Sequence, residues 1–298
     1  MPTAHRGSLA TTLLVLAGAV LWGTAGPASQ FLYQGTDTSP MAVALLRLSL
    51  ATPLLLLIAA PTLRRHAGQL RARARPVLLG GICIALYQVF YFQAVSVSGV
   101  TLATLTALCP VPVLVAILAR LVLDERTMPI PWFGIAAAST GTLLLVGTPE
   151  TESAPAQLIL GAALGLTASL AFSGIALTGR ALGDGMAPMT VTASLFLVGA
   201  LTLSPTILFI PGAVAAAFDS WPTVAFLVLV PTVLAYGLFY GGVGRTPAAV
   251  TGILIVAEPL TAASLGWALF SETLSPLQGV GAALLCIAMV RAALQQRS

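Results

Sequence analysis

The feature that most constrains this chain is a series of long apolar stretches that hold almost no charge. A helix needs roughly 20 residues to cross a hydrocarbon core of about 30 Å. Only 7% of the 298 residues are charged, whereas soluble domains carry about 25%. The sequence therefore predicts an all-α integral membrane protein with ten transmembrane helices. The predicted spans are 9–32, 39–60, 76–97, 100–121, 130–147, 157–179, 188–210, 221–241, 246–269 and 275–294.

The charged residues divide between the two ends of these spans. With a cytoplasmic N-terminus, the inner segments hold Arg6, Arg64, Arg65, Arg71, Arg73, Arg75, Arg120, Arg126, Arg180, Arg245, Arg291 and Arg297. The outer loops hold Asp37, Glu150, Glu152, Asp219 and Glu272. Cytoplasmic loops are enriched in basic residues, and a missed span would invert every later loop. The pattern therefore supports ten spans with both termini in the cytoplasm, and it assigns the net charge of +4 to membrane orientation rather than to nucleic-acid binding.

The second half of the chain repeats part of the first half. A shift of 147 residues aligns Phe92 with Phe239, Thr104 with Thr251, Pro112 with Pro259, Glu125 with Glu272, Pro129 with Pro276 and Gly134 with Gly281. A weaker match sets the first span, around Trp22, on the sixth, around Phe172. Two halves of five spans, 1–149 and 150–298, must have opposite orientations because five is odd. Such inverted repeats are typical of secondary transporters, which hold the substrate near the midplane, so we expect a central cavity between the halves.

Short motifs mark both halves. They are Leu21-Trp22-Gly23, Leu46-Arg47, Ala257-Glu258-Pro259-Leu260 with Ser271-Glu272-Thr273-Leu274, and their first-half counterparts Cys109-Pro110-Val111-Pro112 and Leu123-Asp124-Glu125-Arg126. They resemble the drug/metabolite transporter superfamily, in particular its EamA-type ten-helix branch, and within it most nearly the YddG-type amino-acid exporters. Val111 stands where the second copy has Glu258, so two symmetric carboxylates are not implied. The resemblance implies export of amino acids, related metabolites or drugs across the bacterial inner membrane.

Glu258 and Arg47 are the charged residues that lie well inside predicted spans. A charge at mid-membrane is costly, roughly 3 kcal/mol on insertion scales, so each needs a partner or water. Glu258 is a candidate proton carrier for coupled export, a group that binds a substrate ammonium, or a carboxylate that satisfies backbone groups freed by Pro259. Arg47 neutralises Glu258, binds a substrate carboxylate, or locks the fold as a donor near the outer interface.

Aromatic and amide side chains supply the remaining candidates. The residues expected to bind substrate are Trp22, Tyr87, Gln88, Tyr91, Tyr236, Tyr240 and Arg47. The tyrosines form two pairs with a spacing of four residues, so each pair shares a helix face. Tyrosine hydroxyls inside lipid need a partner, which favours faces that line a cavity; packing between helices is the alternative. Pro112 and Pro259 leave carbonyls without donors and are the candidate hinges.

Motifs of other functional classes are absent from the sequence. The two histidines, His5 and His66, lie in cytoplasmic segments, and the three cysteines lie in apolar runs without a CxxC pattern. No HExxH, GxSxG or lysine-containing phosphate loop occurs. We therefore expect no enzyme, no catalytic residue, no metal and no cofactor. A channel is a less favoured alternative, because the sequence lacks the rings of charged or carbonyl-presenting segments that channels use.

The sequence thus predicts a secondary transporter that works by alternating access. It is expected to export small metabolites, above all amino acids, including aromatic and other large neutral ones. A broad exporter of drugs or cationic metabolites on the same scaffold is the alternative. The expected partners are a small-molecule substrate and the lipid bilayer, with the protein as a monomer and no nucleic acid.

Overall fold

The computed structural model describes residues 9–123, 132–146, 155–183, 185–270 and 275–294, which form helices and no strand. The helices of the first half are α1 (Leu9–Trp22), α2 (Ala25–Gly35), α3 (Pro40–Ala72), α4 (Ala74–Leu108), α5 (Val111–Val122) and α6 (Trp132–Val146). Those of the second half are α7 (Pro155–Leu182), α8 (Pro188–Leu203), η1 (Ser204–Phe209), α9 (Pro211–Ala217), η2 (Phe218–Ser220), α10 (Trp221–Val228), η3 (Leu229–Leu234), α11 (Ala235–Val243), α12 (Ala248–Leu254), α13 (Ala257–Phe270) and α14 (Pro276–Leu294).

Nine apolar helical segments in the described part of the chain are long enough to cross a membrane. They are Leu9–Gly35, Pro40–Ala72, Ala74–Val95, Leu102–Val122, Pro155–Leu182, Pro188–Phe209, Pro211–Val243, Ala248–Leu269 and Pro276–Leu294. The described part of the predicted span 130–147 is α6, whose 15 residues are fewer than a membrane crossing needs, and residues 130, 131 and 147 lie outside the described ranges. An all-helical membrane protein is thereby confirmed, while the count of ten spans stays a prediction.

Several residues used in the sequence analysis lie outside the described ranges. They are Arg6, Asp124, Glu125, Arg126, Pro129, Glu150, Glu152, Glu272 and Arg297, together with the other residues of 271–274. The charge segregation is therefore visible only in part. Arg73 Nη1 donates to the Ala181 carbonyl at 3.4 Å, and Arg180 donates to the Gly244 carbonyl. These contacts join the α3–α4 junction and the ends of α7 and α11 on one side of the molecule.

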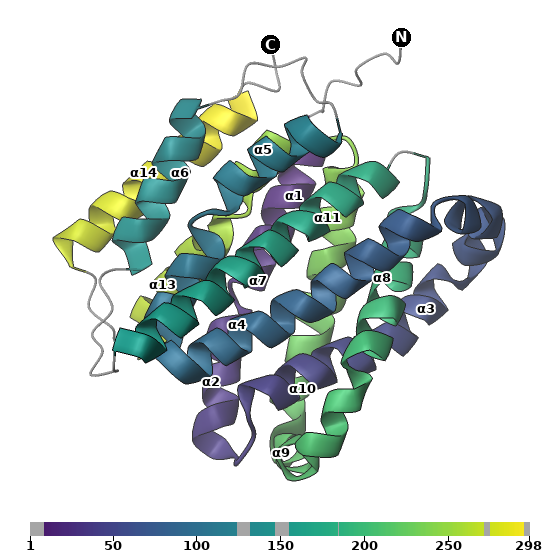
Figure 1. Ribbon diagram of the computed structural model, residues 1–298, viewed down its shortest axis with the longest axis horizontal. Helices are drawn as coiled ribbons and strands as arrows, with labels where there is room; N and C mark the ends of the chain where they lie inside the picture. The colour runs from purple at the N-terminus through teal and green to yellow at the C-terminus, as the bar shows by residue number, and fades with distance from the viewer. Residues whose placement is uncertain (1–8, 124–131, 147–154, 184, 271–274, 295–298) are drawn as a thin grey trace.

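The opposite side carries the connector after α2. Thr38 Oγ1 donates to the Ala213 carbonyl at 2.8 Å and so joins this connector to α9. In Figure 1 the end of α2 and α9 lie at the lower edge, whereas the ends of α3, α5 and α7 lie along the upper right. The arginine-bearing helix ends therefore gather away from the side that carries Asp37 and Asp219.

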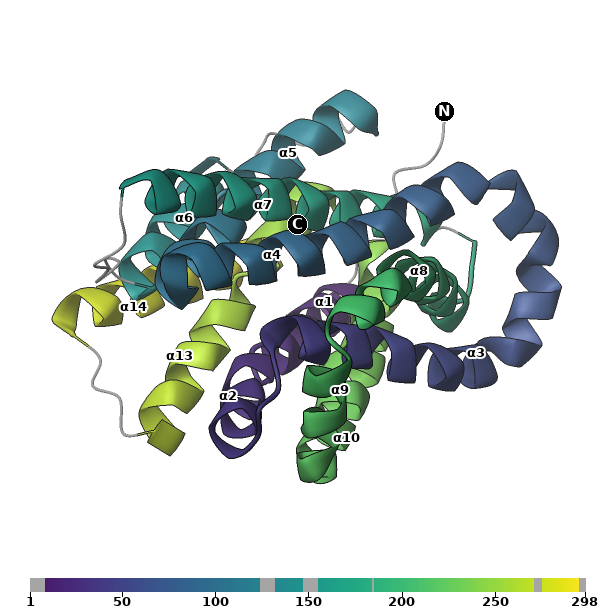
Figure 2. The same cartoon turned by 60° about the horizontal axis from the view of Figure 1, so that its bottom comes forward.

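Close helix pairs build the bundle around its centre. Helices α4 and α7 run side by side, as do α6 and α14, while α3 arcs around the far side (Figures 1 and 2). Small residues permit this approach: Gly161 and Gly165 of α7 face Ser98 and Thr106 of α4. Without a Cβ at these positions the helix backbones come close enough for extensive dispersion contact, as is usual in membranes.

The third and fourth predicted spans share one run of helical backbone. Helix α4 continues past residue 97, where the sequence predicts an end, and stops at Leu108. The break falls at Cys109 and Pro110, because Pro110 has no N–H to continue the helical bonding. Helix α5 then begins at Val111 and places Pro112 in its first turn, where proline is tolerated.

Two further helix breaks meet at the centre. The first span breaks between α1 and α2 at Gly23 and Thr24, and the ninth breaks between α12 and α13 at Ile255 and Val256. A Cβ placed on Gly23 would lie 2.5 Å from the Glu258 carbonyl oxygen, which is far inside van der Waals contact. A residue without a side chain therefore brings the two broken segments together, and the candidate site forms around this junction.

Candidate functional site

A cavity of about 670 Å³ opens at the junction of the broken helices. Residues from α1, α2, α3, α4, α6, α7, α11, α13 and α14 line it. Eight of the ten predicted site residues are among them: Trp22, Arg47, Tyr87, Gln88, Tyr91, Tyr236, Glu258 and Pro259. The tertiary structure therefore gathers in one space side chains that are more than 200 residues apart in the sequence.

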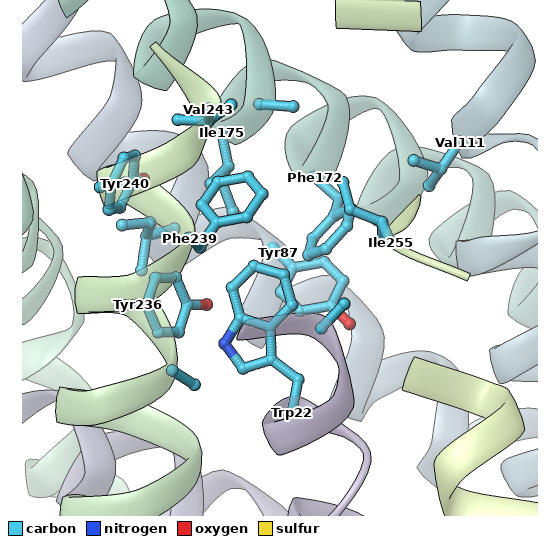
Figure 3. Packing of buried hydrophobic residues seen from close by; sticks show 14 of the residues in the cluster. Trp22, Tyr87, Val111, Phe172, Ile175, Tyr236, Phe239, Tyr240, Val243 and Ile255 are labelled. Carbon is cyan, nitrogen blue, oxygen red and sulfur yellow. The ribbon is translucent and has the colours of Figure 1, made fainter. Parts of the chain in front are cut away.

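Aromatic rings form a wall of the cavity. The ring centroid of Trp22 lies 4.8 Å from that of Tyr236, 4.8 Å from Phe239 and 5.8 Å from Phe172. Tyr87 lies 4.9 Å from Phe172 in turn. Figure 3 shows the Trp22 ring between Tyr236 and Tyr87. Tilted and edge-on contacts at 4.5–7 Å are favourable for aromatic pairs, so these rings hold one another in fixed orientations.

Several polar groups around this wall have unfilled hydrogen-bonding capacity. Gln88 is only 3% exposed, and its amide makes no hydrogen bond to any residue that the structure describes. The Tyr87 and Tyr236 hydroxyls likewise bond to no described residue, and the buried Trp22 Nε1 has no partner. An unpaired buried polar group costs about 1–3 kcal/mol. A polar ligand in the cavity would remove part of this cost.

Arg47 holds α3 against an irregular stretch of the eighth span. Its Nε donates to Thr232 Oγ1 at 3.0 Å, and its Nη2 donates to the Pro231 carbonyl at 3.3 Å. Both acceptors belong to η3, a π-helical segment, in which Thr232 Oγ1 also donates to the Leu227 carbonyl at 2.7 Å. Single π-helical turns inside α-helices are frequent at functional sites. Arg47 thus has the contacts of a fold-locking donor as well as a charge that faces the cavity.

Glu258 lies in the first turn of α13, directly after the helix break. A carboxylate at this position is favoured by the positive end of the helix dipole. Glu258 and Arg47 line the same cavity and interact electrostatically. Within the described ranges, however, no ion pair joins the two side chains. The cavity therefore presents an acidic and a basic group that are not paired with each other.

Two predicted site residues lie outside the cavity lining. Tyr240 is buried, its ring packs close to Gly179, and its hydroxyl has no partner. It lies one helical turn beyond Tyr236 on the same helix face, past the part of α11 that lines the cavity. Pro112 packs against Gly252, whose built Cβ would lie 3.2 Å from the Pro112 Cα. Pro112 and Pro259 both occupy the first turn after a helix break, which is where a hinge would act.

Other lining residues have no local signal in the sequence. They include Ser29, Gln30, Tyr33, Thr104, Phe172 and Gln278. A hydrogen bond of 3.1 Å joins the Thr104 and Tyr91 hydroxyl groups. Thr104 and Phe172 had an indirect indication, because the repeat aligns Thr104 with Thr251 and sets Phe172 on Trp22. Among the described residues, no group of three His, Cys, Asp or Glu side chains is placed to hold a metal ion.

A bundle of apolar helices around a cavity with separated charges and aromatic walls is the architecture of a membrane transporter. The family model of the EamA-like transporter family matches residues 9–147 and 159–292. The chain therefore belongs to the EamA-like transporter family, within the drug/metabolite transporter superfamily. The predicted family resemblance and the prediction of a transporter are confirmed at this level.

Relatives with curated names agree with this assignment. The "Uncharacterized transporter YwfM" of Bacillus subtilis (strain 168) is 28% identical over 281 residues, which cover 94% of this chain and 92% of the relative. "Protein PecM" of Dickeya dadantii (strain 3937) is 27% identical and covers 72% of each chain. A solved structure titled "Crystal structure of protein" matches 98% of this chain and 100% of its own, with a TM-score of 0.77 and 23% identity. That structure supports the fold alone.

Proposed function

We propose that this protein is a secondary transporter that exports amino acids from the cytoplasm of a bacterium. The observation that carries the proposal is the cavity with Glu258 and Arg47 on its lining and no ion pair between them. An acidic and a basic group on one cavity lining suit a zwitterion, which carries both charges. The likeness of the sequence motifs to the YddG-type amino-acid exporters supports the same substrate class.

The aromatic wall favours amino acids with aromatic or other large neutral side chains. Trp22, Tyr87, Phe172 and Tyr236 offer apolar ring faces, and a cavity of about 670 Å³ has room for a bulky side chain. A second candidate is export of cationic metabolites or drugs. It is favoured by the same ring faces beside Glu258, since a cation binds to an aromatic face and a carboxylate together.

Alternating access is the proposed mechanism, between two inverted halves at 1–149 and 150–298. Two separate matches to one family model, 9–147 and 159–292, support the division into halves. A Cβ on Gly18 would lie 2.8 Å from the Ala235 carbonyl oxygen, so α1 of the first half touches α11 of the second half there. Such contacts between the halves are ones that alternating access would make and break.

The proposed location is the bacterial inner membrane, with ten spans, both termini in the cytoplasm and the monomer as the working unit. Its support is the gathering of arginine-bearing helix ends on one side and the rule that basic loops face the cytoplasm. Glu258 is the proposed coupling group, either as proton carrier in antiport or as the ammonium ligand during movement down the solute's own gradient.

Counterflow of a panel of labelled amino acids in proteoliposomes tests the function. Saturable exchange by the wild type is expected, with aromatic and large neutral amino acids the strongest. The matched control is Cys286→Ser, which changes an exposed side chain outside the cavity and should exchange as the wild type does. If folded protein exchanges no amino acid but exchanges organic cations, the second candidate replaces the first.

A further inference from the structure

The first turn of α2 opens onto the cavity without a side-chain cap. Ala25, Gly26 and Pro27 line the cavity. Thr24 stands at the N-cap position, but its hydroxyl donates to the Leu21 carbonyl at 2.7 Å and caps nothing. Pro27 has no N–H, so Ala25 and Gly26 supply the free donors of this turn. The first N–H groups of a helix have no acceptor within the helix, and they carry the positive end of the helix dipole. The uncapped N-terminus of α2, a helix of 11 residues, therefore faces the cavity.

This helix end lies beside Glu258. Gly23, two residues before α2, packs on the backbone of the first turns of α13: its built Cβ would lie 2.5 Å from the Glu258 carbonyl oxygen and 3.1 Å from the Ala262 nitrogen. The positive end of α2 and the Glu258 backbone are therefore neighbours, and Glu258 lines the same cavity as Ala25 and Gly26. In an α-amino acid the carboxylate and the ammonium are attached to the same carbon, so a binding site for both needs opposite charges side by side.

Buried polar groups with no partner point independently to an absent polar ligand. Gln88 is only 3% exposed, lines the cavity and makes no hydrogen bond to a described residue. Trp22, which ends α1 directly before this turn, has an unpartnered Nε1. Arg47 is less available as the direct receptor of a carboxylate, because its Nε and Nη2 donate to Thr232 and Pro231.

We propose that the N-terminal turn of α2 binds the carboxylate of an α-amino acid whose ammonium faces Glu258, and that Gln88 completes the site. Arg47 contributes a positive potential and holds α3 against η3 through its two hydrogen bonds. This inference rests on the proposed function and specifies its substrate as an α-amino acid with a free carboxylate. Decarboxylated amines are then poor ligands, because they leave the helix end unpaired.

Equilibrium binding of labelled phenylalanine to the purified full chain, with phenethylamine as competitor, tests the site. Phenethylamine is phenylalanine without its carboxylate. The wild type should bind phenylalanine at least about tenfold more tightly than the amine. In Gly26→Asp a side-chain carboxylate occupies the place of the substrate carboxylate. Phenylalanine affinity should fall about tenfold or more, while phenethylamine affinity stays equal or rises.

Three comparisons make the result specific. The built Cβ of Gly26 meets no heavy atom within 4 Å, so the aspartate fits, and Gly26→Asn, of equal size, should keep the preference for phenylalanine over the amine. Gly212 is the second residue of α9 as Gly26 is of α2, and it also has open space and lies outside the cavity. Gly212→Asp should therefore bind both ligands as the wild type does. Size-exclusion elution of each variant at the wild-type volume establishes folding.

The outcomes separate this inference from the proposed function. Equal phenylalanine affinity of Gly26→Asp and Gly26→Asn would overturn the carboxylate site. The carboxylate site at α2 would also be overturned if Arg47→Gln abolished the preference for phenylalanine over phenethylamine while Gly26→Asp kept it. Arg47 would then be the group that binds the substrate carboxylate. If folded wild-type protein binds neither phenylalanine nor phenethylamine nor any other amino acid, the proposed function itself fails, and the inference fails with it.

Discussion

Replacement of Gly23 by alanine should destabilise the junction of the two broken helices. The new Cβ would lie 2.5 Å from both the Glu258 carbonyl oxygen and the Thr261 Cβ, and ordinary contact begins at 3.4 Å. The α1–α2 break and α13 must therefore separate by about 1 Å, because one of the two obstructing atoms is backbone and cannot rotate away. Overpacking of this kind costs about 1–3 kcal/mol, which is roughly a 5- to 150-fold change in the unfolding equilibrium.

Reversible unfolding in mixed detergent micelles, followed by tryptophan fluorescence, measures this difference. The matched control is Gly26→Ala, three residues along the same break, where the added methyl group meets no atom within 4 Å. Because alanine favours helix over glycine by about 1 kcal/mol, the control should be as stable as the wild type or slightly more stable. Equal free energies of unfolding for the two variants would refute the close contact at Gly23.

Three further predictions concern the cavity. Glu258→Gln should lose export driven by an imposed pH gradient, and it should also weaken amino-acid exchange in proteoliposomes, because it removes the carboxylate that faces the substrate ammonium. Gradient-driven export retained at the wild-type level would remove Glu258 from coupling. Arg47→Gln should lower the free energy of unfolding by about 2–3 kcal/mol, because two hydrogen bonds from a charged donor are lost. Arg47→Lys should recover only part of this stability, since one ammonium group replaces the forked guanidinium. An Arg47→Gln variant that unfolds like the wild type would contradict a stabilising contact between Arg47 and η3. Tyr240→Phe should leave transport unchanged and should be as stable as the wild type or about 1 kcal/mol more stable, since it removes an unpaired buried hydroxyl. Tyr236→Phe should weaken substrate binding. Equal loss of transport in both variants would show that both hydroxyls act on the substrate.

The membrane class and most of the spans follow from the sequence because the signals are local. Run length and the lack of charge decide whether a segment crosses lipid, and both can be read without knowledge of any neighbour. The motif around Glu258 and Pro259 likewise indicated the family that the match over 9–147 and 159–292 then established. Polar or aromatic residues in apolar runs indicated seven of the cavity's lining residues, since such groups need a partner or water inside lipid.

Helix ends were less predictable where two spans share continuous backbone. The sequence predicts a boundary after residue 97, but hydrogen bonding carries α4 on to Leu108, and only the missing N–H of Pro110 stops it. Hydropathy marks where the chain is apolar, which differs from where the backbone is helical.

The tertiary structure alone decided which face of each helix meets the cavity. Tyr236 and Tyr240 have the same composition and spacing as Tyr87 and Tyr91, yet Tyr240 packs against α7 while the other three line the cavity. The partners of Arg47 lie 184 and 185 residues away, so no local pattern could indicate them. The rotation of a helix about its axis is set by contacts with its neighbours, and those contacts exist only once the chain is packed.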